Sequence, residues 1–144
     1  MVGLVGGMDE LNSLQLSQCP EIECIFHITS NAKIDDLIPK FVELHLRDMN
    51  NLTGLYQGPP LQVLRFFEKL EKLVIKWCIN MHITFPWECN LQNLKMLVLY
   101  LCKSGEVLFS TSVAQSLQKL EELVICECLE LKLIIAACGR EWCS

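Results

Sequence analysis

The hydrophobic residues of the chain follow a pattern, L-x-x-L-x-L-x-x-C-x-x-L, that occurs five times with small departures. The five units begin at Leu11, Phe41, Leu70, Leu94 and Leu120. Successive starts are 30, 29, 24 and 26 residues apart. Within each unit the central L-x-L alternates with period 2, which predicts a short strand that turns both aliphatic side chains to one face. One unit cannot bury that face alone, so we predict a stack of five coils whose strands pair in parallel.

A recurring cysteine position helps to distinguish this stack from packed amphipathic helices, which the spacing L-x-x-L also fits. The position is occupied by Cys19, Met49, Cys78, Cys102 and Cys128. Helix packing does not require a thiol at a fixed offset. We expect each thiol to lie inside the bend after its strand and to donate weakly to backbone carbonyls there. Zinc binding and a disulfide between stacked neighbours remain the alternatives.

The cysteine count also bears on the compartment. The chain contains 9 cysteines, an odd number, and its apolar first eight residues lack the basic segment of a signal peptide. We therefore expect a reducing, cytoplasmic location. Cys138 and Cys143 could pair in the tail, whereas Cys126 and Cys128 should face opposite sides of a strand and not share an ion. The histidines match no ligand spacing, and we expect no metal site and no cofactor.

The segments between the predicted strands differ in length and composition. Helical potential is found in residues 34–40, 61–67 and 112–119. Ser112 is the expected N-cap of the last of these helices. Breakers at Gly58-Pro59-Pro60 and Phe85-Pro86-Trp87 should keep regular helices short. We predict that the connections form a convex side of short helices, 3₁₀ turns and loops.

Composition and motifs narrow the classes of function. Hydrophobic residues make up 51% of the 144 residues, enough for a sizeable core, and the net charge is −5. A mildly acidic chain does not suit a binder of nucleic acid phosphates. Apolar runs are too short for a membrane span. The chain carries no phosphate-binding loop, nucleophile elbow or H-E-x-x-H motif, and we expect neither catalytic residues nor enzymatic activity.

Two units carry a family resemblance. LEKLVIKWC at residues 70–78 and LEELVICEC at residues 120–128 resemble the irregular leucine-rich repeats of plant nucleotide-binding leucine-rich-repeat (NBS-LRR) disease resistance proteins. The resemblance covers residues 8–136 and leaves tails at 1–7 and 137–144. It implies an α/β leucine-rich-repeat solenoid, with a curved parallel sheet on the concave side and irregular turns and short helices on the convex side.

Two positions depart from the repeat pattern. Met49 replaces the cysteine of the second unit, and Gly105 replaces the last aliphatic residue of the fourth. We expect distorted turns at both places.

The resemblance also implies a role, which is protein–protein recognition in plant defence, by effector sensing or by regulation of a receptor. The expected partner is a pathogen effector, a host protein or another domain of a larger receptor. We expect this chain to lack the nucleotide-binding module, as a receptor fragment or a stand-alone protein would. The alternative is the substrate-recognition repeat domain of an F-box-type ubiquitin ligase adaptor, whose repeats are more uniform in length.

Side chains that alternate with the strand leucines should form the concave face and meet the partner. Arginine, tryptophan and tyrosine carry much of the binding energy of interfaces, and valines in this place would form an exposed apolar stripe. Solvated strand positions without a partner are the alternative interpretation. The predicted protein-binding residues are Glu43, His45, Arg47, Lys72, Val74, Lys76, Trp77, Val98, Tyr100 and Val124.

Overall fold

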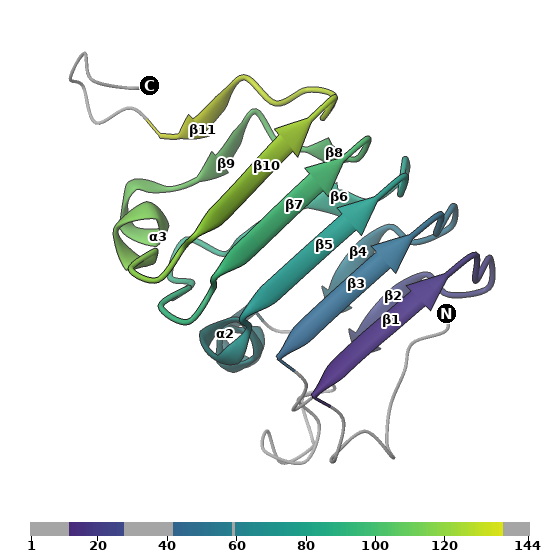
Figure 1. The fold of residues 1–144 in the computed structure, drawn as a ribbon, viewed down its shortest axis with the longest axis horizontal. Coiled ribbons are helices and arrows are strands. Elements are labelled where there is room, and N and C mark those ends of the chain that lie inside the picture. The colour runs from purple at the N-terminus through teal and green to yellow at the C-terminus, as the bar shows by residue number, and fades with distance from the viewer. Residues whose placement is uncertain (1–11, 28–41, 59, 137–144) are drawn as a thin grey trace.

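The computed structural model describes residues 12–27, 42–58 and 60–136, and its main feature is one five-stranded parallel sheet (Figure 1). The strands are β1 (Ser13–Ser17), β3 (Glu43–Arg47), β5 (Lys72–Lys76), β7 (Met96–Tyr100) and β10 (Glu122–Cys126). They lie side by side in chain order, and the columns of the sequence pattern are also the pairing register. Each coil therefore stacks on the one before it, and the predicted leucine-rich-repeat solenoid is confirmed.

The two aliphatic columns of the L-x-L segments form the centre of the core. In the three middle strands both leucine-type side chains are buried, as Leu73 and Ile75 of β5 illustrate. Each such burial stabilises the fold by about 1.5–3 kcal/mol before the loss of conformational entropy is counted. The columns are less covered at the two end strands, where Leu14 is half-buried and Leu123 is 38% exposed. Among the described strands, each end strand pairs with a neighbour on one side only, so the sheet seals its inward side chains from that side only.

Behind the main sheet, the connections form three short parallel pairs that the sequence pattern did not predict. They are β2 (Cys24–His27) with β4 (Gly54–Gln57), β6 (His82–Ile83) with β8 (Lys103–Ser104), and β9 (Val107–Phe109) with β11 (Leu133–Ile135). These segments are two to four residues long, too short to show an alternating pattern. They tie the convex side of each coil to that of another coil.

A row of aromatic rings fills the space between the sheet and the convex side. Phe26 lies 4.9 Å from Phe66, Phe66 lies 5.4 Å from Phe67, and Phe67 lies 5.6 Å from Phe85, measured between ring centroids. Phe85 continues the row to Phe109 at 5.3 Å. Tilted and edge-on ring pairs of this kind add roughly 0.5–1.5 kcal/mol each beyond their buried area. The row runs from the first described coil to the fourth and joins these coils into one core.

Two helices are found where the sequence predicted helical potential. Helix α2 (Pro60–Lys69) contains the predicted segment 61–67, and α3 (Thr111–Ser116) is shorter than the predicted segment 112–119. The N-cap of α3 is Ser110 and not Ser112, because the Ser110 hydroxyl accepts the Val113 N–H at 3.1 Å while Ser112 is exposed inside the first turn. The predicted helical segment 34–40, both tails, Leu11 and Phe41 lie outside the described residues.

A left-handed residue ends every strand of the main sheet. These residues are Gln18, Asp48, Trp77, Leu101 and Glu127, with φ between 52° and 54°. In the first four coils the N–H of this residue donates to a carbonyl at the end of the next strand, as from Leu101 to Cys126 at 3.1 Å. A non-glycine residue in this conformation costs roughly 1–2 kcal/mol. The repeated hydrogen bond to the next coil compensates for this cost.

The expected distortion at Met49 is wrong. Asp48 before it has the same left-handed φ as its equivalents, and Leu52 N donates to Met49 O at 3.2 Å just as Met81 N donates to Cys78 O at 3.0 Å. Met49 is fully buried, and its flexible side chain fills the place of the smaller thiol. The turn before Gly105 does differ, because Cys102 O accepts from Leu129 N of the next coil at 3.2 Å.

We expect the left-handed turn to tolerate unbranched side chains better than β-branched ones. Leu101→Ile conserves the carbon count but places a second carbon on Cβ, which is strongly disfavoured at positive φ. It should lower the free energy of unfolding by about 1–3 kcal/mol in urea titrations followed by circular dichroism. Leu101→Met, which stays unbranched, is the control and should change it by less than about 1 kcal/mol. Equal stability of the two variants would contradict this account of the turn.

Candidate protein-interaction surface

Alternation along the five strands turns every second side chain away from the core and forms the concave face. On this face, residues that are partners in the strand register line up in three rows, and each row runs across the sheet from β1 to β10. The first row is Ser13, Glu43, Lys72, Met96 and Glu122. The middle row is Gln15, His45, Val74, Val98 and Val124. The last row is Ser17, Arg47, Lys76, Tyr100 and Cys126. The structure thus places all the predicted binding residues in these rows except Trp77, which lies in the turn after β5 and contacts the last row from there.

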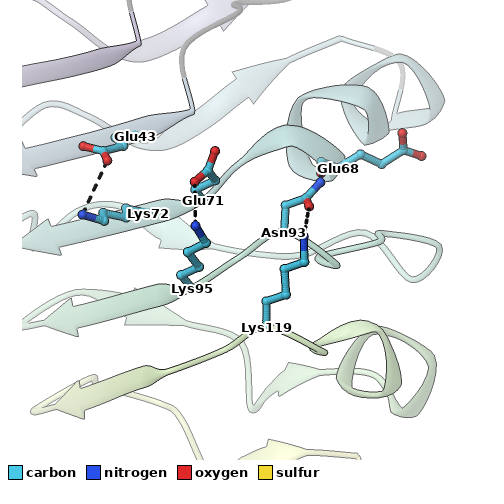
Figure 2. A network of polar contacts seen from close by, with 7 residues as sticks. All are labelled: Glu43, Glu68, Glu71, Lys72, Asn93, Lys95 and Lys119. Atoms are coloured by element: carbon cyan, nitrogen blue, oxygen red, sulfur yellow. Dashed lines mark hydrogen bonds and ion pairs between the residues drawn. The ribbon is translucent and has the colours of Figure 1, made fainter.

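The first row is a region of paired charges. The Glu43 carboxylate lies 3.5 Å from Lys72 Nζ and 4.0 Å from His45 Nε2. Beside this row, Lys95 Nζ lies 3.3 Å from the Glu71 carboxylate (Figure 2). These groups are about one-third to one-half exposed, so water screens the pairs and each adds little to stability. Glu43 and Lys72 thus offset each other's charge, whereas Glu122 at the β10 end of the row is exposed and forms no ion pair with any described residue.

A second polar series runs from coil to coil beside α2. Asn93 Nδ2 donates to the backbone oxygen of Glu68 at 2.6 Å, and Lys119 Nζ donates to Asn93 Oδ1 at 3.2 Å (Figure 2). Glu68, Asn93 and Lys119 belong to three successive coils. These contacts stabilise the stacking of the coils and lie beyond the N-terminal ends of the strands.

The last row combines cations with aromatic rings. The Arg47 guanidinium lies over the Trp77 ring, 4.4 Å from its centroid, and the Trp77 and Tyr100 rings meet edge to face at 5.7 Å. The Asp48 carboxylate lies 3.6 Å from Arg47 Nε. Lys76 is exposed next to Arg47 in the register. A cation over a ring gains roughly 0.5–1 kcal/mol at such exposed sites and holds the long arginine side chain in place.

The middle row changes character along the solenoid. It is polar on β1 and β3, where Gln15 and His45 lie, and consists of valines on the three later strands. Val124 is 38% exposed, and Val74 and Val98 are half-buried. A hollow of about 480 Å³ lies at the polar end of this row, beside Arg47 and Lys76 of the last row. Its lining residues come from β1, β3 and β5. The concave face therefore has a polar, basic half and an apolar half.

The cysteine column lies beneath this face and has the predicted structural role. Cys102 Sγ donates to Tyr100 O at 3.6 Å and to Ile75 O of the preceding coil at 3.7 Å. Cys128 repeats this geometry with Cys126 O at 3.7 Å and Leu99 O at 3.6 Å. The thiols of Cys19, Cys78, Cys102 and Cys128 are free, so the disulfide alternative for this column is wrong. Burial raises the pKa of the Cys78 and Cys102 thiols, which keeps them protonated and able to donate.

Within the described residues, no group of three or more histidine, cysteine or acidic side chains could hold a metal ion. Cys138 and Cys143, whose pairing the sequence left open, lie outside that part of the chain. In the same part, none of the helices has the length and apolar character that a membrane span requires.

Sequence reasoning missed a second hollow, on the convex side. It has a volume of about 350 Å³ and is lined mainly by apolar and aromatic side chains, among them Tyr56, Phe85, Trp87 and Leu108. Trp87 is 74% exposed. The signal in the sequence is Phe85-Pro86-Trp87, which predicts a break in helical structure but does not by itself indicate a surface hollow.

Comparison with known proteins gives one family. The family model described as plant disease resistance protein RPS2-like, leucine-rich repeats, matches residues 2–91, which is more than half of the chain. No curated protein and no solved structure matches.

The buried thiols should make the stability of the fold depend on alkaline pH. Burial, and then the nearby Glu68 carboxylate, raise the pKa of the Cys89 thiol to about 12. A raised pKa means that the folded state holds this proton more tightly, so its contribution is complete below the ordinary thiol pKa and is lost as the pH rises toward 12. Urea titrations at about pH 8 and about pH 10, on either side of the ordinary thiol pKa, should show a falling free energy of unfolding.

The control for this test is Cys89→Ala, which removes one titrating thiol. The variant starts from a lower stability because of the cavity, but its loss between the two pH values should be smaller than that of the wild type. An equal loss in both proteins would show that the Cys89 thiol does not titrate with folding.

Proposed function

The chain belongs to the leucine-rich repeats of RPS2-like plant disease resistance proteins, and on this premise we propose that its concave face binds a protein partner during plant defence. The partner class is a pathogen effector, a host protein that an effector targets, or another domain of a larger receptor. Binding then either senses the effector or regulates the receptor. The single observation that supports this proposal best is the concave face itself, which unites cationic, aromatic and valine side chains from four successive strands.

The chemistry of the concave face favours binding over catalysis. Glu43 pairs with Lys72 at 3.5 Å. Glu122 and its chain neighbour Glu121 line an open hollow of about 500 Å³ beside Lys72 and Lys95, but both are exposed to water, whereas a catalytic carboxyl is usually buried enough to shift its pKa. The cysteines beneath it are engaged as donors to backbone carbonyls. We therefore propose a recognition module without enzymatic activity and with no cofactor of its own.

The family also bears on the alternative of a ubiquitin ligase adaptor. The matched family is that of disease resistance proteins, and the connections on the convex side are correspondingly unequal, with ten residues in α2 and six in α3. We therefore favour recognition in a defence receptor over substrate recruitment to a ligase.

Two tryptophans offer a matched test of the surface. Trp77 borders the concave face and holds Arg47 and Tyr100, whereas Trp87 lies exposed on the convex side. The full chain, fused to a biotin-transferring enzyme, is expressed in leaves challenged with a pathogen, and labelled proteins are quantified by mass spectrometry. We expect Trp77→Ala to reduce labelling of the wild-type partners strongly, since loss of an interface tryptophan typically weakens binding about tenfold or more.

The control and the confirming measurement use the same pair of variants. Trp87→Ala should label the same partners as the wild type, and the leading partner, once purified, should bind Trp77→Ala about tenfold more weakly by calorimetry. Partners that depend on Trp87 and not on Trp77 would move the proposed site to the convex side. Labelling unaffected by either variant would exclude both surfaces.

A further inference from the structure

We propose that the concave face recognises an extended protein segment in which an acidic residue is followed by apolar ones. The carboxylate lies between Arg47 and Lys76, and the apolar side chains lie along Val98 and Val124. This inference rests on the proposed function and adds the chemistry of the partner to it.

Arg47 and Lys76 are placed to share one carboxylate. They are direct register partners on the neighbouring strands β3 and β5, about 4.8 Å apart in the sheet. Both side chains leave the same face at the same edge of the hollow of about 480 Å³. A carboxylate has two oxygens and can accept from both cations at once, and such charge-assisted hydrogen bonds are about twice as strong as neutral ones.

Arg47 and Lys76 differ from Lys72 and Lys95 because they keep hydrogen-bond donors that no described carboxylate occupies. Lys72 and Lys95 are paired with Glu43 and Glu71. Lys76 forms no ion pair with any residue that the structure describes. Arg47 meets Asp48 through Nε, and a guanidinium has two further nitrogens that can serve a second carboxylate. In a chain of net charge −5, this pair is a local positive site that complements an acidic partner.

Arg47 is also held ready for binding. Its guanidinium rests on the Trp77 ring, which is itself braced edge to face by Tyr100. A side chain that is already ordered loses less conformational entropy when the partner binds. The aromatic pair therefore supports the cation site from the side of the later strands.

The valines set the direction of the partner segment. Val74, Val98 and Val124 continue the middle row away from His45, so the face becomes apolar from β5 toward β10. Because this apolar row continues from strand to strand, it suits a partner peptide that lies across the strands. It suits nucleic acid poorly, because two cations on an acidic protein, one of them already beside Asp48, cannot neutralise a run of phosphates.

The experiment is a selection from a phage-displayed library of random linear peptides against the purified full chain. We expect the selected peptides to be enriched in Asp or Glu next to Leu, Val, Phe or Tyr. Their affinities, measured by fluorescence anisotropy, should fall about tenfold or more for the double variant R47E/K76E, because loss of a charge-assisted contact has roughly that effect. The same variant, used as bait in a second selection, should select basic residues in place of acidic ones.

The control is K69E/K132E, which changes the net charge by the same amount on exposed residues outside the concave face. The contact of Lys132 with Glu106 joins two largely exposed groups and adds little to stability. The control variant should bind the selected acidic peptides within about twofold of the wild type. All three proteins are first compared by thermal unfolding, and since the replaced side chains are exposed and their contacts weak, the midpoints should agree to within about 4 °C.

Three outcomes would overturn the inference. They are selected peptides without acidic enrichment, acidic peptides that R47E/K76E binds as well as the wild type does, and tighter binding of a single-stranded oligonucleotide than of the selected peptides. Failure of the proposed function has a different signature. If non-acidic peptides bind and lose affinity in Trp77→Ala, only the acidic preference is wrong, whereas selected peptides indifferent to Trp77, Arg47 and Lys76 would leave no role for the concave face.

Discussion

Every coil of this protein depends on its neighbour to exclude water from the aliphatic side chains of its strand. The strands contribute only two inward side chains each, such as Leu97 and Leu99, and these are buried because the strands on both sides continue the same columns. Hydrogen bonds and aromatic contacts also link each coil to its neighbours: the N–H groups of the left-handed turns donate to the next coil, the thiols donate to the preceding one, and the ring row joins the coils in series. Stability is therefore a property of adjacent coils taken together.

The side chains that stabilise the fold and those that form the concave face are different residues of the same strands. The inward columns set the register, so the outward rows fall into line without contributing much to the core. Arg47, Lys76 and Tyr100 come from three different coils, at positions 47, 76 and 100, yet the register makes them neighbours. A recognition site can thus be assembled from single residues of successive coils, held by a framework that does not involve them.

The parts that the sequence could predict are those that the repeat fixes. The strands, their parallel order, the inward leucines and the face occupied by Arg47 and Val98 all follow from period 2 and a fixed offset. The convex pairs did not follow, since β6 and β8 have two residues each and acquire their strand form only by meeting another coil. The Ser110 cap, the contact of Arg47 with Trp77 and the exposure of Trp87 likewise depend on tertiary neighbours that no local pattern specifies.

The left-handed turn after each strand has a consequence for how such a surface can evolve. Glycine would adopt this conformation with least strain, yet position 77 carries a tryptophan whose ring carries Arg47. A glycine there would make a more relaxed backbone but would erase the ring that orients the arginine. The tryptophan at this turn therefore keeps a small conformational cost of the backbone together with a group that can take part in recognition.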